Sequence, residues 1–123
     1  SKAWKNGFSR FRFGGLPMQF SKHEITAGLE QLSWVDESYW NLPGTLDGAT
    51  LLASTVEEGE AQPQAWVREQ GRGRVLVCIP GHFTWTFDDP LYRTFLLRGL
   101  AWSAHEPVGR FNELVTVGVE LVP

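Results

Sequence analysis

One stretch decides how this chain folds: Gly71-Arg72-Gly73-Arg74-Val75-Leu76-Val77-Cys78-Ile79-Pro80-Gly81-His82. A turn marked by glycines leads into a continuous apolar run, and this pattern predicts a buried strand over residues 74–79. The run ends before Gly81-His82, and a polar loop separates it from Asp89-Pro90, where a helix is predicted to begin. Because ligands of open α/β sheets gather outside the carboxyl ends of the strands, His82 stands at a candidate site.

The segments on either side of this stretch predict a sheet with one clear helix. Apolar and alternating runs predict strands over residues 16–20, 33–41, 49–55, 64–69 and 74–79. The last two strands flank a hairpin turn at residues 70–73. Asp89 is the predicted N-cap and Pro90 the first position of a helix that ends near Ala104. The apolar residues of this helix recur at helical spacing: Leu91, Phe95, Leu96, Gly99, Leu100 and Trp102.

The remaining segments are expected to be turns, loops and chain ends. Residues 1–15 are basic and aromatic and predict an edge strand or a packing arm. A polar turn is expected at residues 21–29, a polar loop at 57–63, and a final strand or extended tail at 114–121. The predicted strands outnumber the helices, and a single helix covers at most one face of a sheet. The chain is therefore expected to be part of a domain or to pair with another copy.

Length and composition exclude several classes of protein. The chain has 123 residues, which suits one small domain, and with 42% apolar and 20% charged residues it is not disordered by composition. A formal net charge of −3 gives no electrostatic case for binding nucleic acid, and no apolar run is long enough to span a bilayer. No signal peptide is visible at the start, and we expect a soluble protein that is cytoplasmic or exported. Because the chain begins with Ser and not Met, an upstream segment could have been removed.

Histidines and carboxylates near the predicted strand ends are the candidate catalytic groups. His82 suits a general acid/base, a metal ligand, or a loop histidine whose ring bonds the backbone. His23, beside Glu24 in a predicted turn, would form with Asp36, Glu37 and His82 a histidine–carboxylate set for a divalent metal. The spacing of these residues matches no compact zinc signature. Turn chemistry for His23 and a solvated acidic pair for Asp36 and Glu37 therefore stay open as alternatives.

Other conspicuous residues have structural explanations. Cys78 lies inside the apolar strand and lacks the exposed turn of a nucleophile, so it is predicted to be a small buried hydrophobe, and no Ser/Cys-His-acid triad is evident. His105 follows the helix and is expected to cap its carboxyl end. Gly71-Arg72-Gly73 is too short for a phosphate-binding loop. Six tryptophans, several of them in segments rich in turn residues, indicate an aromatic-lined pocket or an interface as well as core filling.

The order and approximate spacing of five segments are specific to one protein family. The segments are His23-Glu24-Ile25-Thr26-Ala27-Gly28-Leu29, Asp36-Glu37-Ser38-Tyr39, Pro63-Gln64-Ala65-Trp66-Val67-Arg68-Glu69, Gly71 to His82, and Asp89-Pro90 to Trp102. Together they resemble the later half of the domain of the trehalose-utilisation (ThuA-like) family. The resemblance implies a flavodoxin-like α/β domain related to class I glutamine amidotransferases, without the catalytic cysteine of those enzymes. It also implies a role in sugar metabolism, with trehalose or related or oxidised disaccharides as substrates.

The resemblance also implies which residues form the site. The polar positions that recur in the family fall on His23, Asp36, Glu37, Tyr39 and His82. We expect His82 to be the catalytic acid/base and Asp36 and Glu37 to orient it or to hold a metal.

Substrate contacts are expected from a second group of residues. Tyr39 and Trp85 would stack on the faces of a sugar, with His23 as a further binding residue. A divalent metal is a possible cofactor, and its candidate ligands are His23, Asp36 and His82.

The sequence departs from the family at two points. Glu24 stands where the family usually has proline, and the early strands and helices of the family domain are absent, so residues 1–123 are expected to be one incomplete domain. The expected partners are a small-molecule sugar and a second copy or a complementing chain, with neither nucleic acid nor membrane. The alternative is a non-catalytic, degenerate amidotransferase-like scaffold used for oligomerisation. Convergence of His23, Asp36 and His82 would favour the catalytic or binding site, and scattered positions would favour the scaffold.

Overall fold

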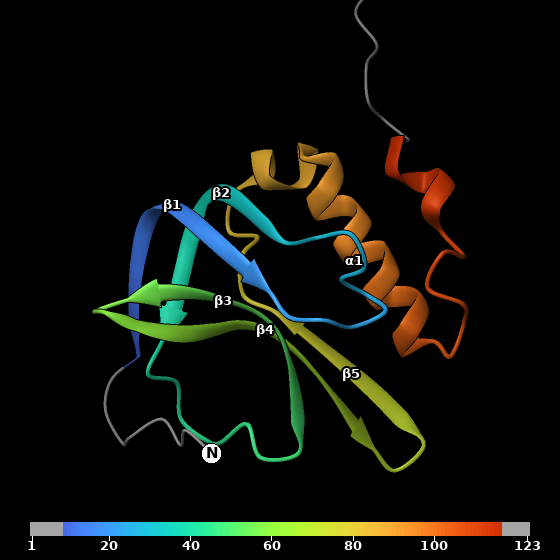
Figure 1. Cartoon of the computed structure of the whole chain (residues 1–123), viewed down its shortest axis with the longest axis horizontal. Coiled ribbons are helices and arrows are strands. Elements are labelled where there is room, and N and C mark those ends of the chain that lie inside the picture. The colour runs from blue at the N-terminus through green and yellow to red at the C-terminus, as the bar shows by residue number, and fades with distance from the viewer. Residues whose placement is uncertain (1–8, 117–123) are drawn as a thin grey trace, which may run out of the picture.

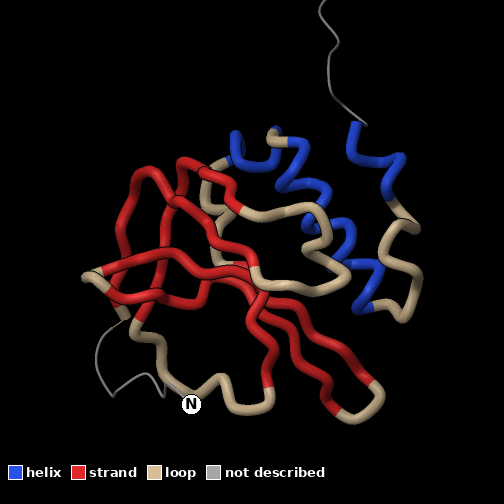
Figure 2. Tube along the Cα trace, viewed as in Figure 1, coloured by secondary structure: helices blue, strands red, loops and turns tan. Residues whose placement is uncertain are grey.

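The quoted stretch forms an edge strand of an antiparallel sheet and the loop that follows it. The computed structural model describes residues 9–116, which form β1 (Arg10–Phe20), β2 (Gln31–Trp40), β3 (Ala49–Glu57), β4 (Glu60–Gln70) and β5 (Gly73–Cys78). The strands lie in the order β2-β1-β3-β4-β5, and neighbours are antiparallel. The helices are η1 (Thr84–Asp88), α1 (Pro90–Ser103) and η2 (Asn112–Thr116). The sheet curls on one side of the molecule, and the helices gather on the other (Figures 1 and 2).

The two hairpins that contain β4 differ in how well the sequence predicts them. The predicted hairpin at 70–73 is confirmed, because Gln70 pairs with Gly73 around a two-residue turn. The predicted loop at 57–63 is wrong, because β3 and β4 continue to a tight turn at Glu58-Gly59. Both turn residues have positive φ, 52° and 78°, as a twisted two-residue hairpin requires. Pro63 lies inside β4 next to a shift in register, where a missing N–H is tolerated.

The first hairpin is longer than predicted and is only loosely joined to the rest of the sheet. The predicted strand at 16–20 is the second half of β1, which begins at Arg10 and pairs with β2 along its length. The first eight residues of the predicted arm lie outside the described residues. Within the described residues, β1 pairs with β3 at two positions near its end, Gln19 with Ser54 and Phe20 with Ala53. The sheet is therefore split along most of the boundary between β1 and β3.

The predicted helix is confirmed at both ends. The Asp89 carboxylate accepts hydrogen bonds from the backbone N–H of Leu91 (2.8 Å) and Tyr92 (3.0 Å), and Pro90 occupies the first helical position. The predicted apolar face is partly wrong, because Leu91 and Leu100 are exposed and Tyr92 is fully buried instead. Buried apolar side chains of the sheet, of the turn between β1 and β2 and of α1 form one core: Leu16, Met18, Phe20, Ile25, Leu29, Trp34, Leu52, Ala53, Ala65, Val67, Tyr92, Phe95 and Trp102.

The mixed α/β class is confirmed, but the finer expectations for the fold are not. Each strand pair in residues 9–116 is antiparallel, so a flavodoxin-like layering, which needs a parallel sheet, is not confirmed. The predicted final strand is wrong at 114–116, which belong to η2, and its remainder lies outside the described residues. His105 does not cap α1 with its ring, because Nε2 hydrogen bonds to the Arg72 carbonyl (2.8 Å). Among the described residues, no helix is long and apolar enough to cross a membrane.

Candidate functional site

The candidate site lies along the outer edge of β2, where the segment after β5 folds across it. Neighbouring residues of a strand point to opposite faces, so Asp36 and Glu37 separate. Asp36 points inward and is fully buried. Glu37 points outward, and its side chain is 12% exposed beside His82. Of the two neighbouring acids, Asp36 thus has a buried carboxylate and Glu37 an outward-facing one.

Asp36 anchors the loop that carries His82. Its Oδ1 accepts hydrogen bonds from the backbone N–H of Glu37 (2.7 Å) and His82 (3.0 Å), and its Oδ2 accepts one from the Thr86 hydroxyl. Burial favours the neutral acid, but the hydrogen bonds from Thr86, Glu37, His82 and Gly81 outweigh it, so the pKa of Asp36 lies below its usual value. Asp36 is therefore ionised at neutral pH and faces backbone amides rather than solvent. This geometry favours the orienting role among those expected for it.

Glu37 joins the two polar side chains that face solvent. Its Oε2 lies 3.4 Å from His82 Nδ1 and accepts a hydrogen bond from the Tyr39 hydroxyl. The hydrogen bond to Glu37, together with burial and the negative charges of Glu37 and Asp36, raises the pKa of Tyr39. The His82 side chain is 55% exposed. With Nδ1 facing Glu37, Nε2 is the ring nitrogen left for a ligand, which is the arrangement of a histidine general base oriented by a carboxylate.

Aromatic rings surround this polar group. The Phe83 ring stacks on Trp85 with centroids 4.2 Å apart, meets the His82 ring edge-on at 4.6 Å, and meets Phe13 at 5.2 Å. On the neighbouring strand, Phe11 stacks on Tyr39 at 5.8 Å. Phe11, Phe13 and Trp85 are at least half exposed. These five residues, Phe11, Phe13, Tyr39, Phe83 and Trp85, are called the aromatic face below.

Trp85 is fixed in place by the edge of the sheet. Its indole Nε1 donates a hydrogen bond to the Val35 carbonyl of β2 (2.7 Å), although half of the residue is exposed. An aromatic ring that is both rigid and exposed suits stacking against a flat apolar ligand surface. The sequence-predicted stacking residues Tyr39 and Trp85 therefore lie on the same face as His82.

His23 lies elsewhere. Its Nδ1 accepts the Ile25 N–H (3.1 Å), which is the turn chemistry left open as an alternative, and its ring packs against Trp102. The Tyr92 hydroxyl contacts the Pro80 carbonyl close to His82, and Trp102 lies ten residues farther along α1, about 15 Å at 1.5 Å per residue. The structure thus brings Asp36, Glu37, Tyr39, His82 and Trp85 together and leaves His23 apart. Of the three residues whose convergence was to separate a site from a scaffold, Asp36 and His82 meet and His23 does not.

The described residues contain no group of three or more His, Cys, Asp and Glu side chains that could hold a metal ion. The candidate metal ligands His23, Asp36 and His82 do not converge, and the carboxylate of Asp36 is already engaged by four donors. Burial raises the pKa of the Cys78 thiol to about 12, so it stays protonated, in line with the expected small hydrophobe. The polar chemistry of the site therefore comes from Glu37, Tyr39 and His82.

Two residues of the site are hard to find in the sequence. Thr86 of η1 and Phe83 just before it stand in a segment with no motif, and nothing in the sequence marks the hydroxyl of Thr86 as a partner of Asp36 fifty residues away. Phe11 and Phe13 do carry a signal, since they alternate with polar residues as one face of a strand does. That signal predicts the strand but not which side of the molecule the rings occupy.

Comparison with protein families gives a match that covers most of the chain. The profile of a family described as trehalose utilisation (ThuA) matches residues 7–103, which span the whole sheet and α1. No curated protein and no solved structure matches the chain significantly.

Proposed function

Because the chain belongs to the trehalose-utilisation (ThuA) family, we propose that the edge of β2 binds a carbohydrate, trehalose or a related or oxidised disaccharide. The observation that carries the proposal is the contact of Glu37 with both His82 and Tyr39 beside the exposed ring of Trp85. Sugars present apolar C–H faces and polar hydroxyl rims. An aromatic platform next to a carboxylate, a phenol and an imidazole complements both kinds of surface.

The geometry supports acid/base chemistry on the bound sugar. Nε2 of His82 accepts or gives a proton at a sugar hydroxyl, while Glu37 orients the imidazole through Nδ1. The Tyr39 hydroxyl donates its proton to Glu37, so its oxygen is an acceptor for a sugar hydroxyl. Asp36 contributes indirectly, because it holds the backbone of His82 in place.

The proposal is tested by titrating the ¹⁵N-labelled protein with trehalose, then with other glucosides and oxidised disaccharides, and following the NMR spectrum. We expect the Trp85 indole and His82 resonances to shift, since both groups are exposed at the site. Trp85→Ala should weaken binding about 10-fold, the effect of losing one aromatic contact of about 1.4 kcal/mol. His82→Gln should keep binding and lose turnover.

Matched controls make this experiment specific. His105→Gln removes another exposed histidine, whose ring contacts the turn at Arg72 instead of the site. Leu100→Ala removes an exposed apolar side chain of α1. Both variants should bind sugar as the wild type does. If no sugar of the panel shifts Trp85 or His82, the carbohydrate site is wrong.

A second candidate function is favoured by the exposure of the aromatic face. Phe11 is 64% exposed and Phe13 53%, and contiguous exposed apolar surface of this kind often marks a protein interface. In the scaffold alternative, this face joins two copies of the chain. Native mass spectrometry before and after chelator treatment would then show a metal-free oligomer, and Phe13→Ser should convert it to a monomer. A wild type that is strictly monomeric would contradict the scaffold.

A further inference from the structure

The free edge of β2 is closed by side chains instead of by another strand. The Val35 carbonyl, the Glu37 N–H and both backbone groups of Tyr39 bind side chains. The Trp85 indole binds the Val35 carbonyl, and Asp36 binds the Glu37 N–H. At Tyr39 the partner is Gln64 of β4, whose Oε1 accepts the Tyr39 N–H (3.4 Å) and whose Nε2 donates to the Tyr39 carbonyl (3.0 Å).

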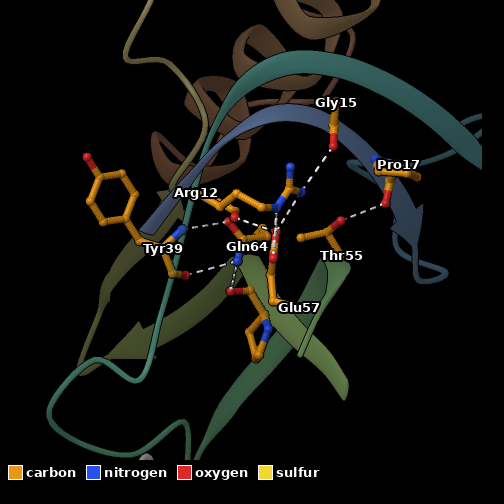
Figure 3. A network of polar contacts seen from close by, with 9 residues as sticks. Arg12, Gly15, Pro17, Tyr39, Thr55, Glu57 and Gln64 are labelled. Carbon is orange, nitrogen blue, oxygen red and sulfur yellow. Dashed lines mark hydrogen bonds and ion pairs between the residues drawn. The ribbon is translucent and has the colours of Figure 1, made fainter. Parts of the chain in front are cut away.

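The contact between Gln64 and Tyr39 crosses the inside of the curled sheet. β2 and β4 are not neighbours in the strand order, and yet the Gln64 amide imitates the two hydrogen bonds of a strand partner (Figure 3). A carboxamide is the uncharged side chain that offers a donor and an acceptor side by side, which is what this task requires. Gln64 is fully buried, and Nε2 also donates to the Pro63 carbonyl (3.0 Å), so its orientation is fixed. The Tyr39 ring points away from it (Figure 3).

The residue next to Tyr39 is held from the same side. Ser38 donates a hydrogen bond to the buried Glu57 carboxylate of β3 (2.6 Å), which also accepts hydrogen bonds from Arg12 at 2.7–3.0 Å. Burial opposes ionisation of Glu57, but the hydrogen bonds from Arg12 and Ser38 outweigh it and lower its pKa. Two consecutive residues of β2 are thus fixed from inside the curl, while Glu37 and Tyr39 face outward.

We propose that Gln64 is a positioning residue of the site: by holding both backbone groups of Tyr39, it keeps the Tyr39 hydroxyl on Glu37 and so aims Glu37 at His82. The inference rests on the proposed function in that it takes the contact of Glu37, Tyr39 and His82 to be the ligand-binding group. The geometry gives Gln64 no contact with a ligand, since it is fully buried behind β2. Its influence runs through the backbone of Tyr39.

The pKa of the Tyr39 phenol shows whether the phenol still contacts Glu37. The chain has two tyrosines, and Tyr92 is fully buried with its hydroxyl on the Pro80 carbonyl. Burial raises the pKa of Tyr92 far above the ordinary value, so Tyr39 titrates first. Glu37 contacts the Tyr39 phenol, with His82 beyond it, and the buried Asp36 acts on the phenol through its charge alone. The ring stacked on Tyr39 from β1 is the uncharged Phe11.

The test is a pH titration of the ¹³Cζ NMR signals of labelled tyrosine, recorded without sugar. In Gln64→Leu the Tyr39 pKa should fall toward its ordinary value, because the phenol leaves Glu37. Thr55→Val is the matched control: Thr55 is equally buried and donates to the Pro17 carbonyl (2.9 Å), but does not touch Tyr39. It should lose stability as Gln64→Leu does and leave the Tyr39 titration unchanged. An unchanged titration in folded Gln64→Leu would overturn the proposal.

Two further measurements keep the proposal falsifiable. If Gln64→Leu does not fold, Gln64→Met retains the length of the side chain without its amide. In the wild type, the Tyr39 amide hydrogen should exchange slowly although it lies on a free strand edge, and fast exchange would overturn the proposal. In the sugar titration, Gln64→Leu should bind about 10-fold more weakly, the effect expected when a positioned hydrogen-bonding group is displaced, and Thr55→Val as the wild type does. If the sugar site is wrong, the wild type itself shows no response in the sugar titration. If the positioning role is wrong, the tyrosine titration without sugar is the same in Gln64→Leu as in the wild type.

Discussion

Replacing Asp36 with alanine should lower the free energy of unfolding by about 4 kcal/mol and abolish sugar binding. The change leaves the N–H groups of Glu37, Gly81 and His82 and the hydroxyl of Thr86 without their acceptor. Each buried group left unsatisfied costs about 1–3 kcal/mol, and water entering the gap recovers part of this. Urea unfolding measures the loss of stability, and the NMR titration measures the loss of binding. A loss below about 1 kcal/mol would show that other contacts hold the loop.

Asp36→Asn separates the charge from the hydrogen bonds. The amide keeps one acceptor oxygen, so this variant should lose less than Asp36→Ala, and it removes the titration of the carboxyl. Because the pKa of Asp36 is lower in the folded state than in the unfolded one, its ionised form adds stability above about pH 4. That contribution disappears as the pH falls through the folded pKa. The wild type should therefore lose stability in acid more steeply than Asp36→Asn. Equal slopes would contradict the role given to the Asp36 charge.

Gly81→Ala should destabilise the protein by about 3 kcal/mol and displace His82. Gly81 has φ of 133°, in a region that residues with a side chain rarely adopt, where strain costs about 1–3 kcal/mol. An added Cβ would also lie 2.7 Å from the Tyr92 hydroxyl oxygen and 3.3 Å from the Phe87 ring. The backbone at Pro80 would have to move to relieve this, although the Tyr92 hydroxyl holds its carbonyl. Thermal unfolding measures the loss, and the chemical shifts of the His82 ring report the displacement.

Two further variants separate the backbone strain of Gly81→Ala from the steric clash of its new methyl group. Gly28→Ala introduces a side chain at φ of 78° with nothing within 4 Å of the new Cβ, so it should cost about 1 kcal/mol. Tyr92→Phe removes the hydroxyl that the new methyl group would meet, so Gly81→Ala should cost less in that background. An equal cost of Gly81→Ala in both backgrounds would place the whole effect in the backbone strain.

The parts of the fold that the sequence predicts well have local causes. The Gly71-Arg72 turn and the Asp89-Pro90 helix start depend on neighbouring residues, and both occur where predicted. The predicted loop at 57–63 failed because Pro63 and the polar residues around it hide a strand. The antiparallel pairing of β4 and β5 follows from their hairpin, whereas the flavodoxin-like layering is not confirmed, since no residue encodes by itself which distant strand it will meet. Leu100 of α1 is exposed although its spacing places it with the apolar residues. Helical spacing thus predicts the direction of the buried face but not how many residues it includes.

The sequence predicts which residues belong to the candidate site but not how their side chains are placed relative to one another. Asp36, Glu37, Tyr39 and His82 follow from the resemblance and meet in the structure because β2 is an edge strand that the loop after β5 crosses. The opposite orientations of Asp36 and Glu37 follow from strand geometry once β2 is known. His23 was grouped with them although the chain carries it to the far end of α1. Gln64 and Thr86 act through hydrogen bonds to Tyr39 and Asp36, residues that are distant in the sequence and meet only in the folded chain.

The split between β1 and β3 gives this fold a simple route for evolutionary change. Main-chain ladders are alike for every sequence, whereas the gap between these strands is bridged by side chains, Thr55 on the Pro17 carbonyl and Arg12 on Glu57. The width of the opening is thus set by the lengths of a few side chains. Substitutions there that change the length of a side chain would move the first hairpin against the second, and the rings of Phe11 and Phe13 with it, whereas Thr55→Val keeps the size of the side chain and leaves the hairpin in place. A change in the length of these side chains would thus reshape the aromatic face while every strand keeps its register.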